Sequence, residues 1–388
     1  MDFSISEEQR AFVDVVRRVC QKEFKPRAAK YLDGTWPAEN IKRLAEIGVM
    51  GMAVPQSYGG SGLGILDTVL VLEEIGKVCY VTAMAALGEL GVQTRIIAAH
   101  APEPVKRRVL PRVATGEAIL AICMTEPNAG TDVPSYTTNS DIRGDRVILH
   151  GVKTLISRAD IAEMFVVFTR VNKVPGAAGI GCVLVPGGVK GLTAKASFHT
   201  MGGEYLSEVV FDNVELPLEN LVIRANGMKR LLSAFNTQRC LNPAICLGLA
   251  EGALEEAVRY MRDRSAFGQK IGDFQGLRWK AADMYIEIEA ARGLLYRAAV
   301  SGAEFPDPTL AAMAKIYCNE MSVRVTSEAI QIHGGYGFTD EFPVSRYFRG
   351  ARYGSLGGGT TETLRNLVGK KLVEEMDLVT GCLGTGTF

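Results

Sequence analysis

Apolar residues recur with two different spacings along this chain, and the spacing changes twice. In residues 1–117 they return every three or four positions, the period of an α-helix, and Ser6 and Gln9 stand at the spacing of a helix-capping box. In residues 118–228 short runs rich in Val, Ile and Phe alternate with Gly, Pro and Asn, which predicts strands. From residue 229 to residue 388 the helical spacing returns. The sequence therefore predicts a mainly α chain with a central β domain, in three domains with these bounds.

The central region has no long helical patterns between its strands, so we expect a small β domain and not a doubly wound sheet. The expected strands are Arg146–His150, Met164–Val171, Gly179–Val185 and Glu208–Phe211. In the last third, two apolar faces follow helical spacing and predict a four-helix bundle. These faces are Leu254, Val258 and Met261, and Met284, Ile288, Ala291 and Leu295.

Composition excludes several classes of function. The 43 basic and 43 acidic side chains balance, so the chain has no electrostatic signature of a nucleic-acid or acidic-membrane binder. The eight cysteines form no C-x-x-C pair or zinc spacing, which favours reduced thiols and no metal site. There is no basic-then-apolar leader at the start, and no uncharged apolar run reaches the ~20 residues that a membrane helix needs. We therefore expect a cytoplasmic protein.

Five short motifs occur in a fixed order. Residues 55–63 read Pro-Gln-Ser-Tyr-Gly-Gly-Ser-Gly-Leu, and residues 124–132 read Met-Thr-Glu-Pro-Asn-Ala-Gly-Thr-Asp. Residues 264–269 read Arg-Ser-Ala-Phe-Gly-Gln, and residues 331–337 read Gln-Ile-His-Gly-Gly-Tyr-Gly. Residues 349–362 begin with Arg-Gly-Ala and end with Gly-Gly-Gly-Thr-Thr-Glu. Each motif is similar to one of the acyl-CoA dehydrogenase family, and together they make the chain resemble that family over nearly its whole length.

The resemblance implies the acyl-CoA dehydrogenase fold, with an N-terminal helical domain, a middle β domain and a C-terminal four-helix bundle. It also implies FAD as cofactor and an acyl-CoA thioester as substrate. The positions that match the family's FAD contacts are Ile122, Met124, Thr125, Gly130, Thr131, Leu155, Ile156, Ser157, Arg264, Ala266, Phe267, Phe274, Gln275, Gln331, Gly334, Gly335, Thr360, Thr361 and Glu362. An arginine suits a pyrophosphate because its planar fork bonds two oxygens at once. Leu155 takes the place of the family's aromatic residue against the flavin.

The family's catalytic glutamate falls on Gly358 in this sequence. A glycine keeps the backbone N–H that polarises the thioester carbonyl in the family, but it supplies no base to remove the α-proton. Some branches carry the base before a retained arginine that orients the pocket. Here that arginine is Arg239, and the residue before it is Gln238, an amide with no useful proton affinity. Both base positions of the family are therefore neutral.

A third possibility for the base is a carboxylate on the helix expected around residues 82–97. Glu89 is the acidic side chain there, and two interpretations remain open for it. It is either a relocated base or a glutamate that is solvated or paired with a cation.

Three functions follow from the resemblance. The first is an FAD-dependent acyl-CoA oxidoreductase without the usual base, working as a dehydrogenase or, as in crotonobetainyl-CoA reductases, as an enoyl-CoA reductase. The second is a redox-neutral lyase similar to the acyl-CoA desulfinases. The third is a flavin-holding subunit of a hetero-oligomer. For the first, the resemblance implies an electron-transfer flavoprotein as partner and a homotetramer, in which Arg264 and Gln275 complete a neighbouring subunit's FAD site.

Overall fold

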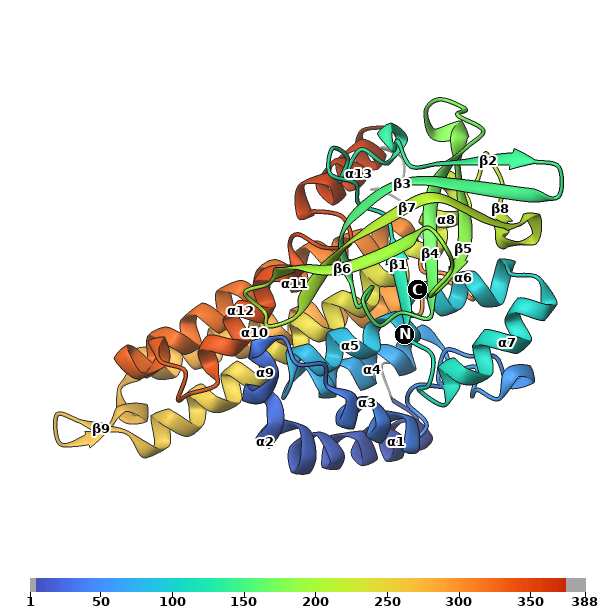
Figure 1. Cartoon of the computed structure of the whole chain (residues 1–388). Coiled ribbons are helices and arrows are strands. Elements are labelled where there is room, and N and C mark those ends of the chain that lie inside the picture. The colour runs from blue at the N-terminus through green and yellow to red at the C-terminus, as the bar shows by residue number, and fades with distance from the viewer. Residues whose placement is uncertain (1–4, 375–388) are drawn as a thin grey trace. The chain divides into compact units, whose positions relative to one another are not determined.

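The computed structural model describes residues 5–374 (Figure 1). The chain forms two compact units. The first comprises the described residues of Met1–Lys22, Val69–Val78 and Arg239–Phe388, and the second comprises Glu23–Thr68 and Cys79–Gln238. The expected class, mainly helical with a central β domain, is confirmed. The three-domain bounds at residues 117 and 228 stay a prediction.

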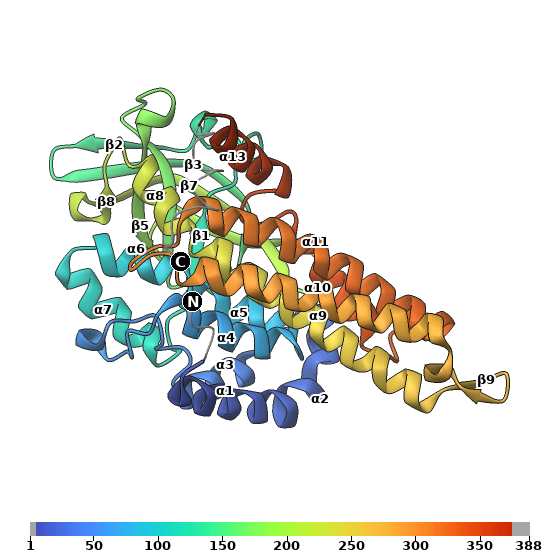
Figure 2. The same cartoon turned by 180° about the vertical axis from the view of Figure 1, so that it is seen from behind.

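Long helices dominate the first unit. α10 (Gln275–Ala299) and α11 (Pro308–His333) lie side by side, as both views show (Figure 2), and α9 (Gln238–Asp263) borders α10 along an open groove. The start of α11 follows from its sequence, because Asp307 accepts hydrogen bonds from two backbone N–H groups of the first turn at 2.9 Å. The other elements of this unit are α1 (Glu7–Val19), the end of α4 (Ile65–Gly76), the hairpin β9 (Ser265–Ala266) and β10 (Gln269–Lys270), α12 (Val344–Gly354) and α13 (Thr361–Glu374).

One of the two predicted helical faces is buried as expected, and the other is not. The buried face of α10 includes the predicted set Met284, Ile288, Ala291 and Leu295. On α9, Met261 is buried, but Leu254 and Val258 are only half-buried and line the groove towards α10. The buried side of α9 instead carries Gly248 and Gly252, where an added Cβ would overlap backbone carbonyl oxygens at the end of α4 and just after it. Close backbone contact therefore decides which face of α9 is buried, and apolar spacing does not reveal it.

The second unit combines short helices with an eight-stranded sheet in the order β6-β7-β3-β2-β4-β5-β8, with β1 paired to β4. Its helices are α2 (Lys25–Arg27), α3 (Ala38–Glu46), α5 (Tyr80–Leu90), α6 (Val92–His100), α7 (Glu103–Ala114) and α8 (Met228–Phe235). Its strands are β1 (Leu120–Cys123), β2 (Asn139–Arg143), β3 (Arg146–Ser157), β4 (Met164–Val171), β5 (Ile180–Pro186), β6 (Leu192–His199), β7 (Tyr205–Pro217) and β8 (Leu221–Ile223).

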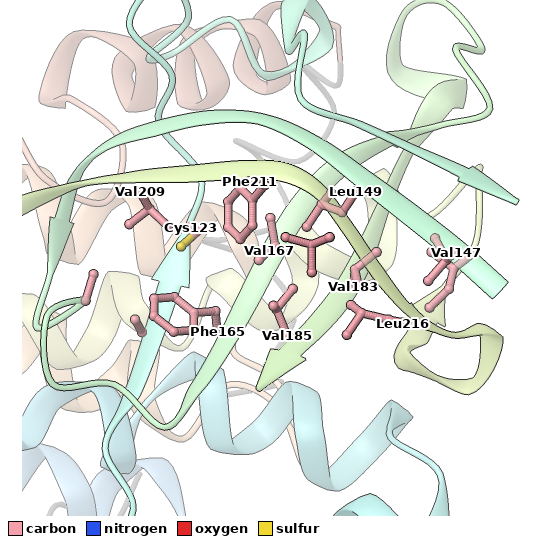
Figure 3. Close-up of a cluster of buried hydrophobic side chains, with 14 of the residues drawn as sticks. Cys123, Val147, Leu149, Phe165, Val167, Val183, Val185, Val209, Phe211 and Leu216 are labelled. Carbon is pink, nitrogen blue, oxygen red and sulfur yellow. The ribbon is translucent and has the colours of Figure 1, made fainter. Parts of the chain in front are cut away.

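The core of this sheet is apolar and lies between strands that are far apart in the sequence (Figure 3). Phe165 and Val167 of β4, Val183 of β5 and Phe211 of β7 are all buried in one cluster. Because β4 is buried along almost its whole length, it reads as a continuous apolar run, and its predicted bounds are confirmed.

Strands with one solvated face were harder to predict. β3 and β7 extend well beyond the predicted runs, and β7 continues through residues 212–217. β6 was not predicted, because its burial alternates between half-exposed and exposed positions and offers few apolar residues to a pattern search. Pairing with β7 makes it a strand.

Within residues 5–374 no helix is both long and apolar enough to cross a membrane. Seven cysteines lie in that range, and all of them are buried and outside any disulfide, whereas Cys382 lies outside the described residues.

Candidate functional site

A pocket of about 530 Å³ in the first unit brings together four of the predicted FAD contacts. Arg264 follows α9, while Gln331, Gly334 and Gly335 stand at the end of α11. The other residues that line it are Tyr260, Ile271, Ile332, His333, Tyr336 and Thr339. Two helix ends that are separated by more than 60 residues in the sequence thus meet in one cavity. Their contact with FAD stays a prediction.

Part of the wall of this pocket is glycine backbone and the ring of His333. Gly334 ends α11 with φ +60°, and an added Cβ on Gly334 or Gly335 would meet nothing within 4 Å. The His333 ring stacks on Tyr260 at 4.4 Å, and its buried Nε2 has no hydrogen-bond partner in the described structure. Burial lowers the pKa of His333, so its ring is neutral at pH 7. An arginine and a spare ring nitrogen fit a pyrophosphate with its neighbouring polar groups, while the Gly334 N–H already donates to the Gln331 carbonyl.

Four other predicted FAD contacts do not line this pocket. Ala266 and Phe267 lie on the β9–β10 hairpin, and Phe274 and Gln275 begin α10. The Phe267 side chain is 96% exposed, with its ring 6.2 Å from that of Phe274.

The turn between α12 and α13 carries Gly358, where the resemblance places the family's glutamate. Gly358 and Gly359 adopt φ +75° and +91°, in the left-handed region that only glycine enters freely. Lys315, fully buried in α11, donates hydrogen bonds to the carbonyl oxygens of Gly354 at 2.8 Å and Gly359 at 3.0 Å. Burial lowers the pKa of Lys315 to about 8. Lys315 thus ties both ends of the turn to the helix beneath it, a role that the motifs did not reveal.

The threonines after this turn start α13. The Thr360 hydroxyl accepts from the Thr363 backbone N–H at 3.3 Å, which caps the helix, and Thr361 is buried. Glu362 is exposed in the first turn, where a backbone hydrogen bond lowers the pKa of its carboxyl. These three predicted contacts therefore also have local roles at a helix N-terminus.

Gln238 and Arg239 are the first residues of α9. The Gln238 amide oxygen lies against the bend at Gly91, 3.4 Å from the point where a Cβ on that glycine would stand. Arg239 is buried in the first unit, and burial lowers its pKa from the usual value. Neither side chain is a base at neutral pH.

Glu89 is paired. Its side chain is fully buried in α5, with Oε1 accepting from the Leu120 backbone N–H and Oε2 accepting from Arg158 Nη1, each at 2.8 Å. Burial raises the pKa of Glu89, and the Arg158 guanidinium opposes that rise. The geometry agrees with the second of the two interpretations drawn from the sequence.

The predicted flavin residues of the β domain lie on two segments that are joined by hydrogen bonds. The Thr154 backbone N–H donates to the Thr125 carbonyl at 2.9 Å, so the segment after β1 runs beside the end of β3. Lys153 reinforces this contact from inside, donating to the Met124 carbonyl at 2.7 Å and to Glu126 Oε1 at 2.9 Å. Burial lowers the pKa of Lys153 to about 8. This buried pair was missed, because no local pattern connects residues 27 positions apart.

Side chains near these segments differ in exposure. Leu155 is 50% exposed with φ +57°, Ile156 is buried, and Ser157 is half-buried. Ile122 of β1, Met124 and Thr125 are half-buried, whereas Gly130 and Thr131 are exposed in the following turn.

Ser157 also lines a small cavity of about 80 Å³ with a carboxyl that the sequence did not single out. Glu204, in the turn before β7, accepts from the Tyr80 hydroxyl at 3.0 Å, and its buried Oε2 has no partner in the described structure. Burial raises the pKa of Glu204 to about 7. Nothing in the local sequence distinguishes this glutamate from a solvated one.

Within residues 5–374 no three or more His, Cys, Asp or Glu side chains lie together in a group that could hold a metal ion.

Comparison with known proteins agrees with this architecture. The N-terminal, middle and C-terminal domain models of acyl-CoA dehydrogenase match residues 6–117, 121–214 and 225–373. The short-chain-specific acyl-CoA dehydrogenase of Clostridium acetobutylicum is 34% identical over 378 residues, covering 96% of this chain and 100% of that protein. The 3-sulfinopropanoyl-CoA desulfinase of Advenella mimigardefordensis is 36% identical over 386 residues, covering 96% and 95%. The structure of butyryl-CoA dehydrogenase from Megasphaera elsdenii superimposes with a TM-score of 0.92 at 32% identity, covering 96% and 100%.

This chain belongs to the acyl-CoA dehydrogenase family. It is an enzyme of the oxidoreductase class typical of that family, and FAD is its cofactor.

Proposed function

We propose that the protein is an FAD-dependent acyl-CoA oxidoreductase that works on an unusual acyl-CoA without the family's glutamate base. The observation that carries this proposal is Gly358, at the base position, in a turn whose backbone is fixed by Lys315. A fixed turn keeps the Gly358 N–H available to a thioester carbonyl, which would stabilise negative charge that develops on its oxygen. The protein would bind and polarise an acyl-CoA while lacking a carboxylate at that point.

Within this proposal, Thr125 and Ser157 would bond the edge of the flavin ring, and the Arg264 pocket would hold the pyrophosphate of a neighbouring subunit's FAD. Bound FAD supplies hydride transfer to or from the β-carbon. The chain's own residues are proposed to orient the acyl group, with Arg239 and Gln238 facing it. In the reducing direction a proton from water completes the addition at the α-carbon, so the enzyme needs no base of its own.

The missing base favours enoyl-CoA reduction over simple dehydrogenation. Removal of an α-proton from a saturated thioester needs a positioned base, which contributes roughly 10²–10⁴ in rate. None of the three positions drawn from the sequence meets that requirement. Gly358 and Gln238 are neutral, and the carboxylate of Glu89 is paired with Arg158. An electron-transfer flavoprotein is the proposed electron partner.

The second candidate function is a redox-neutral acyl-CoA desulfinase. It is supported by 36% identity to the 3-sulfinopropanoyl-CoA desulfinase of Advenella mimigardefordensis over 96% of this chain. Release of a sulfinate group from an acyl-CoA likewise needs no α-proton abstraction, so the absence of the glutamate is compatible with both functions.

Anaerobic mixing separates the two candidates. The FAD-loaded protein would be mixed with saturated, unsaturated and sulfinate-bearing acyl-CoAs while flavin absorbance and product mass are followed together. Re-oxidation of dithionite-reduced flavin by an enoyl-CoA supports the oxidoreductase. Turnover of a sulfinate-bearing acyl-CoA with the flavin oxidised throughout would refute it in favour of the desulfinase.

A homotetramer is proposed for the assembled enzyme. The support is a set of exposed apolar side chains on the first unit, with Phe267 at 96%, Trp279 at 61% and Ile286 at 63% exposure. Apolar surface of this kind commonly marks a protein interface. Sedimentation velocity of the FAD-loaded protein tests it, and a monomer at micromolar concentration would contradict the proposal.

A further inference from the structure

The end of β3 has an unusual backbone. Leu155 and Arg158 both have positive φ, +57° and +62°, although neither is a glycine. The pairing of β3 with β7 also shifts its register between Lys153 and Ile156. Non-glycine residues enter the left-handed region only when the surroundings hold them there. Something outside the strand must therefore fix the four residues that include Ser157.

Hydrogen bonds from the Arg158 guanidinium to α5 hold this segment in place. Nη1 donates to the Ala85 carbonyl and to Glu89 Oε2, each at 2.8 Å. The Gln93 amide has one orientation in which both its nitrogen and its oxygen are hydrogen-bonded. In that orientation the Gln93 oxygen accepts from Arg158 Nη2 at 3.2 Å. Arg158 is thus bonded to three residues across the bend between α5 and α6, all within the second unit.

The helix is shaped to receive this side chain. Gly88 lies directly under the guanidinium, and a Cβ at that position would overlap both terminal nitrogens of Arg158. The Glu89 side chain is fully buried, and its other oxygen accepts from the Leu120 backbone N–H at 2.8 Å. A buried carboxylate with both oxygens bonded to fixed partners has a structural task, because moving it to take a proton from a substrate would leave Arg158 as an unpaired buried charge.

We propose that Glu89 and Arg158 are a positioning pair, which holds Leu155–Ser157 in the conformation that presents the Ser157 hydroxyl to the flavin. Glu89 acts through Arg158 and takes no part in proton transfer. This inference rests on the proposed contact of Ser157 with FAD. It makes Glu89 and Arg158 positioning residues, and it requires a glycine at position 88 so that the guanidinium can reach its partners.

The test measures FAD affinity by titrating apoprotein and records the absorption spectrum of the bound flavin. We expect Glu89→Gln, Arg158→Gln and Gly88→Ala each to weaken FAD binding at least ~10-fold, the ratio that corresponds to 1.4 kcal/mol. Gly88→Ala is the most informative variant, because it leaves both charges in place and only displaces the guanidinium. Gly293→Ala, in α10 with nothing within 4 Å of the added Cβ, is its matched control and should bind FAD as the wild type does.

Coupling and rescue distinguish a positioning role from general destabilisation. The double variant Glu89→Gln/Arg158→Gln should bind FAD no more weakly than the worse single variant, because the two residues form one unit. Arg158→Lys, which keeps the charge and one donating nitrogen in place of the planar guanidinium, should bind FAD more tightly than Arg158→Gln and recover part of the wild-type flavin spectrum. A purely structural pair would lower the unfolding temperature of the variants while their folded fraction bound FAD normally.

The competing role of Glu89 as a base predicts a different pattern. In that case Glu89→Gln would lose α-proton exchange of a bound acyl-CoA in D₂O while FAD affinity stayed at the wild-type value, and Gly88→Ala would change neither. That pattern would overturn the positioning pair and leave the FAD enzyme intact. A wild-type apoprotein that took up no FAD would instead refute the proposed function itself.

Discussion

Replacing Gly358 with glutamate tests the missing-base argument directly. The backbone there has φ +75°, so any side chain with a Cβ is strained, by roughly 1–2 kcal/mol for a residue in the left-handed region. Gly358→Ala carries the same strain without a polar group, and Gly358→Gln adds an amide of the same shape as glutamate. The three variants should therefore lose similar stability, and only the glutamate variant gains a carboxylate.

The expected gain is catalytic. A positioned general base contributes roughly 10²–10⁴ in rate, so Gly358→Glu should exchange the α-proton of a saturated acyl-CoA at least ~10-fold faster than Gly358→Gln, even with imperfect placement. Exchange is followed in D₂O by mass spectrometry, alongside anaerobic bleaching of the flavin by the same acyl-CoA. Thermal unfolding of all three variants measures the shared cost of the strain.

The comparison with glutamine decides the outcome. If the glutamate variant exchanges no faster than the glutamine variant while both retain FAD and bind acyl-CoA, position 358 does not face the α-carbon. If Gly358→Ala keeps the full stability of the wild type, the positive φ is not a constraint on this turn and the magnitude above is wrong.

Three further expectations concern buried groups. Because the pKa of Glu204 is about 7 in the folded protein, above its usual 4.5, the stability it contributes is present at pH 4.5 and below and lost as pH rises through 7. The stability of Glu204→Gln relative to the wild type should therefore rise between pH 5 and pH 8. The rise is up to about 3 kcal/mol, at ~1.4 kcal/mol per pKa unit, and less with solvent screening. Paired thermal unfolding scans measure it, and a stability difference that stays constant with pH would contradict the prediction. Lys315→Met removes two hydrogen bonds and leaves the Gly359 carbonyl oxygen without its donor, whereas Asn319 still donates to the Gly354 carbonyl at 2.7 Å. This variant should cost about 1–3 kcal/mol, seen as a lower unfolding midpoint in urea than that of the exposed Lys370→Met. Gly252→Ala places a Cβ against the Lys77 carbonyl oxygen and should destabilise the protein by about 1–3 kcal/mol, whereas the exposed Gly293→Ala should be neutral or stabilising. Equal unfolding temperatures for the two variants would mean that α9 can move away from that carbonyl at no cost in stability.

Several structural features of this protein follow from short stretches of its sequence. The capping box at Ser6 and Gln9 is present, and β4 has the predicted bounds, because both depend on residues that are neighbours in sequence. The motif at residues 331–337 likewise contains the glycine that ends α11, beside Arg264 in one pocket, although its contact with FAD stays a prediction. The change of texture from helix to strand and back likewise predicted the fold class, since each period reports one kind of secondary structure.

The tertiary structure decided what individual charged residues do. Glu89 and Arg158 are 69 positions apart, and only the packing of α5 against the end of β3 makes a pair of them. Lys153 and Glu126, and Glu204 with its unpartnered oxygen, depend in the same way on contacts between distant strands and turns. A sequence shows which side chains carry charge, whereas burial and the nearest partner fix whether that charge is a base, a clamp or a neutral acid, and both are properties of the folded chain.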